Sequence, residues 1–257
     1  MFINEHFIFD NRSSQEFGIS NIRVSSDLIE VPFGVNRNIV EDKVNGGNNF
    51  YFYGMDKEPL SFTLTFSLLE EAATFEKRIE LVRWLFQDSY KPFISDDNPE
   101  IVYYAIAIGD SKFFDNGFGQ GYFQVQFRCS APHAFSSIYV QDFDLSNNAE
   151  HQTIILENKS NILKYYYPEI TIEMKGSTDI TLKNNADGGR EFIFAGLLAS
   201  EIVYINNHRK QIISNQNGVY RYNNFNKNWL RLPYGTSQIE VTGRCKLQVR
   251  SQFPIAI

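Results

Sequence analysis

The sequence predicts a mainly β protein of two domains, an α+β domain with one amphipathic helix followed by an antiparallel β-sandwich. Three observations lead to this fold class. Apolar and polar residues alternate with a period of two along many short segments, one segment alone has helical spacing, and a polar stretch without periodicity separates the two halves. Successive side chains of a strand point to opposite faces of a sheet, so the alternation indicates strands with one buried and one solvated face.

The strands alternate clearly in both halves of the chain. In the first half, Ser61–Phe66 places its apolar residues on one face, and Phe123–Arg128 does the same with its glutamines and arginine on the other. In the second half the alternating segments are Ile170–Lys175, Ile180–Leu182, Phe192–Phe194, Ile239–Val241 and Leu247–Val249. Turn sequences such as Asp187-Gly188-Gly189 and Asn217-Gly218 separate these short strands, which is typical of a β-sandwich.

One segment, about residues 71–87, has the spacing of a helix. Its apolar residues recur at intervals of three and four and are Ala72, Phe75, Ile79, Val82 and Phe86. Charged residues fall mainly between them, and neither Gly nor Pro interrupts the run. The segment is therefore predicted to be an amphipathic helix with these five residues on its apolar face.

The domain boundary is expected between residues 136 and 150, because residues 141–152 are polar and acidic with little periodicity. We accordingly assign residues 1–140 to the first domain and residues 141–257 to the second. No secretory signal and no apolar run of membrane-spanning length occur, so we expect synthesis and folding in a cytoplasm and no contact with a membrane.

The net charge of the chain is -6, with 24 Lys+Arg against 30 Asp+Glu. This balance argues against a protein dedicated to binding nucleic acid, which needs a basic face for phosphate contacts. It is compatible with a pore through which DNA passes without being held. Cys129 and Cys245 are expected to be free thiols in the core, since two cysteines in a chain of this length do not make a disulfide framework.

The sequence contains no recognisable catalytic, cofactor or metal motif. The four histidines are scattered without a second ligand at metal-binding spacing, and no Gly-x-Ser-x-Gly elbow or phosphate-binding glycine loop occurs. A glycosidase-type site with two carboxylates stays an open alternative, because two carboxylates that meet in the fold leave no pattern in the sequence spacing. We expect a protein without cofactor or metal that is not an enzyme.

Aromatic residues of the second half allow an alternative function. Tyr220, Tyr222 and Trp229 could stack on sugar rings, as exposed aromatic side chains do in carbohydrate-binding sandwiches. The same residues could equally fill the sandwich core. The alternative is therefore a carbohydrate-binding or adhesin module that contacts glycans of a host cell wall.

The first half contains, in this order, the segments Phe7–Asp10, Phe17–Ile19, Val44–Asn48 ahead of Asn49–Phe52, Glu58–Leu60, Arg83–Phe86, Tyr103–Ala105 and Phe127–Phe135. Their order resembles the distal tail protein (Dit) family of siphophages. The last run is similar to the family's strand ending in Cys-x-x-Pro before an aromatic pair, although His133 stands where an aromatic residue is common. The second half resembles the family's galectin-like sandwich in Leu156–Asn158, Pro168–Ile172, Ile180–Asn184, Val203–Asn206 and Trp229–Gly235.

The resemblance implies a structural virion protein at the tip of a long, non-contractile phage tail. Six copies would form a ring through their first domains, continue the tail tube, and serve as a hub for host-adsorption proteins. The implied partners are the tail tube protein, the tail-associated lysin or fibre protein, the tape measure protein and receptor-binding proteins.

Within such a ring, the aperiodic segment Val35–Asn49 is predicted to be an arm that wraps a neighbouring subunit. The residues assigned to this inter-subunit arm are Asn38, Ile39, Val40, Val44, Asn45, Gly46, Gly47 and Asn48.

Overall fold

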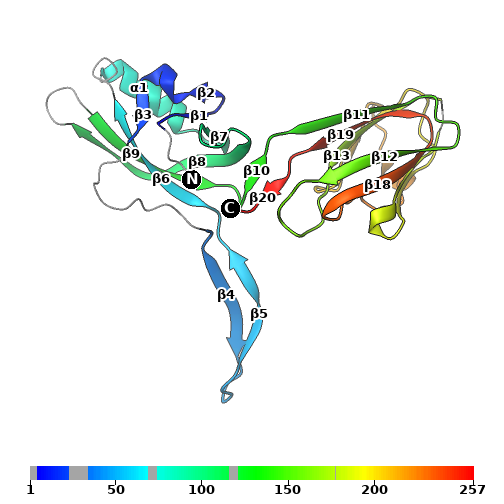
Figure 1. Cartoon of the computed structure of the whole chain (residues 1–257), viewed down its shortest axis with the longest axis horizontal. Coiled ribbons are helices and arrows are strands. Elements are labelled where there is room, and N and C mark those ends of the chain that lie inside the picture. The colour runs from blue at the N-terminus through cyan, green and yellow to red at the C-terminus, as the bar shows by residue number, and fades with distance from the viewer. Residues whose placement is uncertain (1–4, 23–33, 69–73, 116–120, 177) are drawn as a thin grey trace. The chain divides into compact units, whose positions relative to one another are not determined.

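The computed structural model describes residues 5–22, 34–68, 74–115, 121–176 and 178–257. The protein is mainly β with antiparallel sheets, as the sequence predicts (Figure 1). It folds as two compact units, residues 1–136 together with 255–257, and residues 137–254. Each unit is described by itself.

The first unit contains a large antiparallel sheet with the strand order β2-β1-β7-β8-β9-β6-β3. Its strands are β1 (Phe7–Phe9), β2 (Arg12–Ser13), β3 (Ile19–Asn21), β6 (Ser61–Leu68), β7 (Lys91–Ser95), β8 (Ile101–Asp115) and β9 (Gly121–Cys129). Strand β10 (Ala134–Ser136) pairs with β8 and with the C-terminal strand β20 (Pro254–Ile255). Two further strands, β4 (Arg37–Lys43) and β5 (Phe50–Lys57), form a separate two-stranded sheet.

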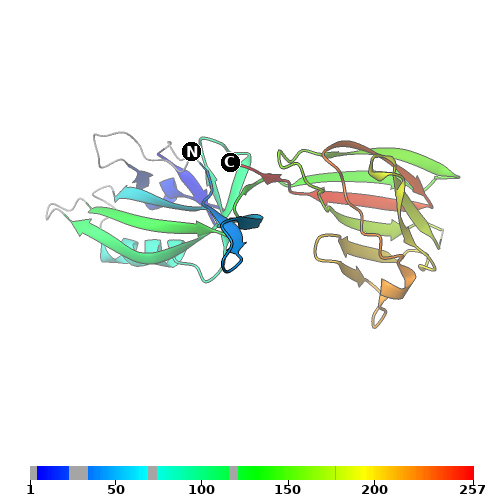
Figure 2. The ribbon, with the colours of Figure 1, turned by 90° about the horizontal axis from the view of Figure 1, so that it is seen from below.

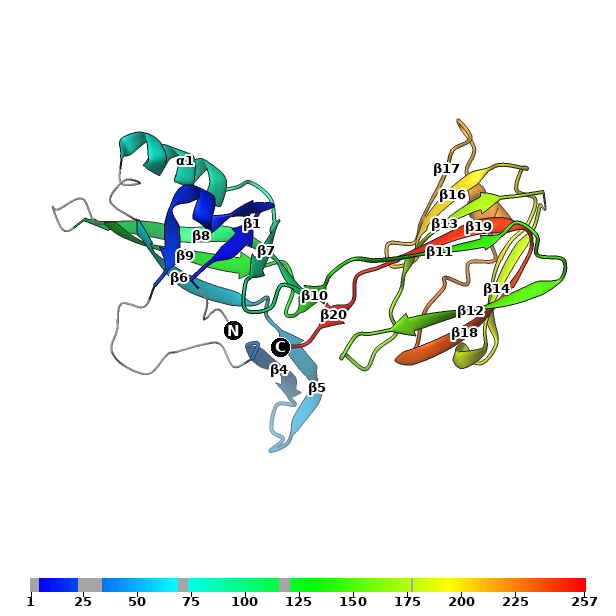
Figure 3. The same cartoon turned by 45° about the horizontal axis from the view of Figure 1, so that its top comes forward.

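Aromatic residues dominate the core of the first unit. Phe9, Phe66, Phe93 and Phe127 are fully buried and contact one another or their neighbours through their rings. Helix α1 (Phe75–Leu85) packs on one face of the sheet and contributes Trp84 to this core (Figures 2 and 3). The alternation of β6 and β9 therefore places their phenylalanines on the buried face, while their Ser, Thr and Gln side chains and Tyr122 occupy the opposite face.

The buried face of α1 differs from the predicted one. Leu81, Trp84 and Leu85 are buried, whereas Phe75 is 76% exposed and Val82 is 55% exposed. Ile79 and Phe86 are half-buried, and Ala72 lies outside the described residues. Both sets of residues have helical spacing, so the spacing predicts a helix but does not say which stripe faces the sheet.

Trp84 accounts for the orientation of the helix. Its indole stacks on Phe17 with 4.0 Å between ring centroids, and its Nε1 donates a hydrogen bond of 2.8 Å to the carbonyl oxygen of Phe9. A buried indole needs an acceptor for its N–H, and these contacts provide one. The helix begins after Thr74, whose hydroxyl oxygen accepts a hydrogen bond from the backbone N–H of Lys77.

The second unit is an antiparallel β-sandwich (Figure 3). One sheet has the order β11-β19-β13-β16-β17, with β11 (Tyr139–Leu145), β13 (Glu169–Met174), β16 (Ile202–Asn206), β17 (Gln211–Ser214) and β19 (Cys245–Ser251). The other has the order β12-β18-β14-β15, with β12 (His151–Asn158), β14 (Ile180–Asn184), β15 (Arg190–Phe194) and β18 (Gly235–Thr242). The alternating apolar residues predicted for both sheets are buried in one shared core.

Two charged contacts join loops of the sandwich. Glu201 is fully buried and accepts hydrogen bonds of 2.8 and 2.7 Å from Nε and Nη2 of Arg221. Asp187 accepts hydrogen bonds of 2.7 and 3.0 Å from Arg231, whose guanidinium lies 4.0 Å from the ring centroid of Tyr165. Both are bidentate contacts, the strong form of the arginine–carboxylate interaction.

The two cysteines are buried free thiols, as expected. Cys129 lies in the core of the first unit and Cys245 in the core of the second. Burial raises the pKa of each thiol to about 12, because the charged thiolate is disfavoured away from water.

Candidate interaction surfaces

The hairpin formed by β4 and β5 is the most exposed ordered feature among the described strands. Every residue of β4 is exposed, and so is every residue of β5 except Gly54, which is half-buried. The strands pair from Arg37↔Lys57 at the base to Lys43↔Phe50 at the tip. Between these ends the register shifts at Val40 and Glu41, because Tyr53 is an extra residue without a partner across the hairpin.

The hairpin is rich in large apolar side chains that its own chain does not cover. Their exposed fractions range from 44% for Met55 to 69% for Tyr53. The whole set is Ile39, Val40, Val44, Phe50, Tyr51, Phe52, Tyr53 and Met55. A two-stranded hairpin is at best marginally stable alone in water, and exposed apolar surface of this extent is typical of interaction sites, so the hairpin is a candidate contact surface.

The turn and the base of the hairpin are defined by local hydrogen bonds. At the turn, the backbone N–H of Gly47 donates to the carbonyl oxygen of Val44 over 2.9 Å, and Gly46 has a φ of +84° that favours glycine. At the base, Nδ2 of Asn38 donates to Oε1 of Glu58 over 2.7 Å, and the N–H of Glu58 donates to the carbonyl oxygen of Asn36 over 3.1 Å. These contacts give the hairpin a definite shape before any partner binds.

The structure brings the predicted arm residues together in this hairpin. Asn38, Ile39 and Val40 lie in β4, and the remaining five, Val44, Asn45, Gly46, Gly47 and Asn48, form the connection to β5. The segment lacks a clear periodicity in sequence, yet its part Arg37–Lys43 forms a regular strand. The aromatic strand β5 was missed as part of the arm, although an Asn-Gly-Gly-Asn turn between two extended segments is a hairpin signal.

The three aromatic residues considered for sugar stacking have different surroundings. Tyr220 is 83% exposed, whereas Trp229 is half-buried and packs against Phe225 with 4.8 Å between ring centroids. The hydroxyl of Tyr222 accepts a hydrogen bond from the N–H of Ile212 and donates one to the carbonyl oxygen of Lys210. The two tyrosines therefore keep exposed ring surface, while Trp229 contributes to the core.

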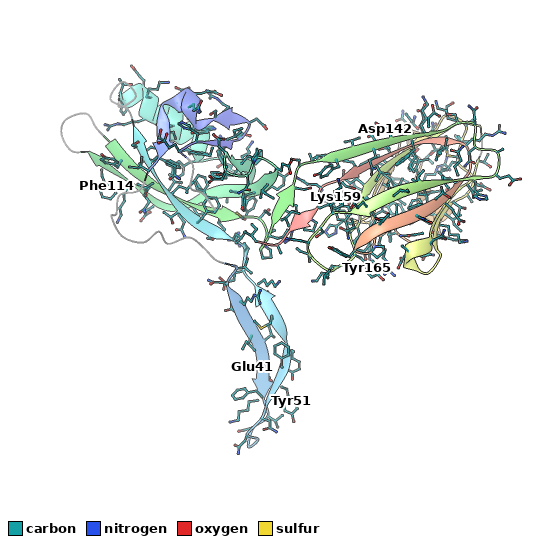
Figure 4. All side chains as sticks on the ribbon, viewed as in Figure 1. Glu41, Tyr51, Phe114, Asp142, Lys159 and Tyr165 are labelled. Atoms are coloured by element: carbon teal, nitrogen blue, oxygen red, sulfur yellow. The ribbon has the colours of Figure 1, made fainter. Side chains whose placement is uncertain are left out.

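A shallow hollow of about 460 Å³ lies on the sheet that contains β11, β13, β16 and β19. Its lining combines three carboxylates with one lysine and with amide, hydroxyl and apolar groups, namely Asp142, Phe143, Asp144, Thr171, Glu173, Ile202, Lys246, Leu247 and Gln248. Asp142 is labelled in Figure 4 and accepts a hydrogen bond of 2.9 Å from Gln248. Hydrogen bonds from Ser146, together with the nearby charge of Lys246, lower the pKa of Asp144.

Among the described residues, His, Cys, Asp and Glu side chains nowhere cluster in a group of three or more that could hold a metal ion. Within the same part of the chain, none of the helices is long and apolar enough to span a membrane.

Both halves of the chain match models of phage tail protein families. Residues 2–131 match the phage tail protein N-terminal domain, and residues 134–250 match the phage tail C-terminal domain. The chain therefore belongs to this family of phage tail proteins.

Particular relatives are similar along almost the whole chain. An uncharacterized protein derived from the SPbeta prophage, YomH of Bacillus subtilis (strain 168), is 25% identical over 97% of both chains. The Dit protein of phage SPP1 has the same fold with a TM-score of 0.68 and 13% identity, over 96% of this chain and 98% of that one. A chain of the phage P2 baseplate has a TM-score of 0.51 and 7% identity, over 95% and 97%. The SPP1 protein is described as a paradigm of the hub adsorption apparatus in phages that infect Gram-positive bacteria.

Proposed function

We propose that this phage tail protein is the ring-forming hub at the tip of a long, non-contractile tail. Six copies close through their first units and join the tail tube to the lysin or fibre protein of the tip. Host-adsorption proteins attach to this hub, and the protein has a structural rather than an enzymatic role. Family membership over both halves and the fold shared with SPP1 Dit support the proposal.

The exposed β4–β5 hairpin is the observation that carries the ring proposal. In a closed ring with a heterologous interface, every copy has one surface that binds the next copy and a different surface that is bound by the previous copy. No interface is therefore left unpaired. The hairpin is a preformed structure with uncovered apolar side chains, as expected for the surface by which one copy binds the next. The net charge of -6 suits a ring through which DNA passes, because the chain has no excess of cations to hold phosphate.

The solution mass of the purified protein tests the ring. Six copies of 29.8 kDa correspond to about 179 kDa, which size exclusion with light scattering measures directly. We expect this mass, and a ring with a central hole in negative-stain images of the same peak. A particle of another copy number, or an open filament, would contradict the closed hexamer.

A second candidate function is glycan binding by the second unit. The hollow beside Asp142 favours it, because carboxylate, amide and hydroxyl groups on an open sheet face can bind sugar hydroxyls. Titration of the full-length protein with soluble wall polysaccharide in a calorimeter tests this function. Heat of binding that disappears in an Asp142→Ala, Gln248→Ala variant would support it, and equal heat in both proteins would exclude the hollow as the site.

A further inference from the structure

The two faces of the β4–β5 hairpin differ in chemistry. Residues that pair across the two strands lie on the same face, and the faces alternate along each strand. One face carries Ile39, Phe50, Phe52 and Met55 together with Arg37, Glu41, Lys43 and Lys57. The other carries Asn38, Val40, Asp42, Tyr51, Gly54 and Asp56, and Glu58 bonds to Asn38 on that side of the base. We name them the Phe52 face and the Tyr51 face. Glu41 pairs with Phe52 and so lies on the first, whereas Tyr51 lies on the second; Glu41 and Tyr51 are labelled in Figure 4.

The Phe52 face is apolar and cationic. Its three basic residues exceed its single acid, Glu41, and Nζ of Lys43 lies 5.6 Å from the centroid of the Phe50 ring. With roughly 200 Å² for a fully exposed large side chain, its four apolar residues present on the order of 450 Å² of surface. That is about half of what one partner contributes to a specific protein interface.

The Tyr51 face is polar and acidic. Asp42, Asp56 and Glu58 lie on it without a basic residue among the paired positions. Its paired positions carry two large apolar side chains, Val40 and Tyr51, which stand between the acids, and Gly54, which has no side chain. Tyr53 has no partner across the hairpin, so the pairing assigns it to neither face. Burying this face would remove carboxylates from water without a matching cation of the hairpin, which is costly.

We propose that the hairpin docks on a second copy of this chain through its Phe52 face, with its Tyr51 face turned to solvent. The inference rests on the proposed ring and names the contacting face of its arm. The charges point to a second copy as the occupant. The hairpin from Asn36 to Glu58 contains three basic and four acidic residues, so the remaining chain carries a net charge of -5. A cationic apolar face is attracted to a surface of that sign.

Matched single substitutions on adjacent residues test the face. Phe52 and Tyr51 are neighbours in one strand with similar exposure, 64% and 55%, and neither belongs to either core cluster. We expect Phe52→Ser to raise the protein concentration needed for assembly by at least about 30-fold per interface, because the loss of one interface hot spot weakens binding by about this factor. Tyr51→Ser is expected to leave the mass distribution of the wild-type protein unchanged. Thermal unfolding of both variants, compared with the wild-type protein, verifies that the units stay folded.

Charge reversals and crosslinking give independent readouts. Lys43→Glu with Lys57→Glu should weaken assembly, whereas Asp42→Lys with Asp56→Lys should leave it intact. A photo-crosslinking phenylalanine analogue at position 52 should yield a covalent dimer of about twice 29.8 kDa, and the same analogue at position 51 should not.

The outcomes separate the face from the ring. If Tyr51→Ser dissociates the particle, or position 51 crosslinks in place of position 52, the face is wrong while the ring stands. If both positions crosslink, the one-sided contact is wrong. A wild-type protein that stays at 29.8 kDa at every concentration contradicts both the ring and the docking face.

Discussion

Replacing Arg221 by Ala should destabilise the second unit strongly, because it leaves a buried carboxylate without its cation. Glu201 is fully buried and accepts hydrogen bonds from two guanidinium nitrogens, from Oγ of Ser214 at 2.6 Å and from the N–H of Leu198 at 2.9 Å. Breaking a buried ion pair by removing one partner costs about 3–5 kcal/mol. We expect a loss of this size in the free energy of unfolding of the second unit.

Denaturant unfolding followed by tryptophan fluorescence measures this loss. The chain has two tryptophans, Trp84 in the first unit and Trp229 in the second. In a Trp84→Phe background the remaining signal reports the second unit alone. Lys246→Ala is the matched control, since Lys246 and Asp144 form an exposed pair at 3.8 Å whose loss should hardly change the stability. A loss below about 1 kcal/mol for Arg221→Ala would refute the reasoning.

The pH dependence of this variant tests the same pair in another way. Burial alone raises the pKa of Glu201, but hydrogen bonds from Arg221, Leu198 and Ser214 outweigh it, so the net pKa is lowered. Because the pKa of Glu201 is lower in the folded than in the unfolded chain, its carboxylate contributes stability at pH values above the unfolded pKa near 4.3. This contribution is lost as the pH falls through the folded pKa. In Arg221→Ala burial dominates and the pKa rises. The difference in stability between the wild-type protein and the variant should therefore begin to shrink as the pH falls through the raised pKa of Glu201 in the variant, above the unfolded value near 4.3. It should go on shrinking until the pH reaches the lowered pKa of Glu201 in the wild-type protein.

Two further predictions concern the cores. Trp84→Ala should lower the free energy of unfolding of the first unit by about 3–5 kcal/mol in denaturant unfolding. Phe75→Ala, on the exposed side of α1, should change it by less than about 0.5 kcal/mol. Equal effects of the two substitutions would contradict the observed orientation of the helix. Cys129 and Cys245 should not react with a thiol reagent at pH 8 in the folded protein, because both are buried and have a pKa of about 12. Both should react in denaturant. Rapid reaction of the folded protein would show that one of the two cores opens.

The contacts that carry the proposed function are separated from the contacts that hold the fold. Both core clusters consist mainly of residues of the main sheets and α1, with some from the loops between them, and the hairpin residues belong to neither. Substitutions at the tip of the hairpin can therefore change assembly without unfolding the units. This separation makes the face assignment of the hairpin testable by mutation.

The amino-acid sequence by itself determined the alternating strands of the main sheets, the helix α1 and the buried thiols. Alternation with a period of two places each side chain of a strand on a face, and this is a local property, so Phe62, Leu64 and Ile172 could be assigned to the core directly. The absence of catalytic motifs and the order of weak motifs led to the prediction of a structural phage tail protein. The family models show that the chain is a phage tail protein.

Only the tertiary structure decided the features that depend on partners distant in the sequence. The stripe of α1 that faces the sheet is set by Trp84, whose indole reaches a carbonyl of β1 that lies 75 residues earlier. The buried pair Glu201–Arg221 joins residues that no motif connects. The hairpin exists because β5 pairs with β4 rather than with the large sheet, and its two chemical faces follow from that register. Such choices depend on packing and pairing between segments, and local spacing carries no information about them.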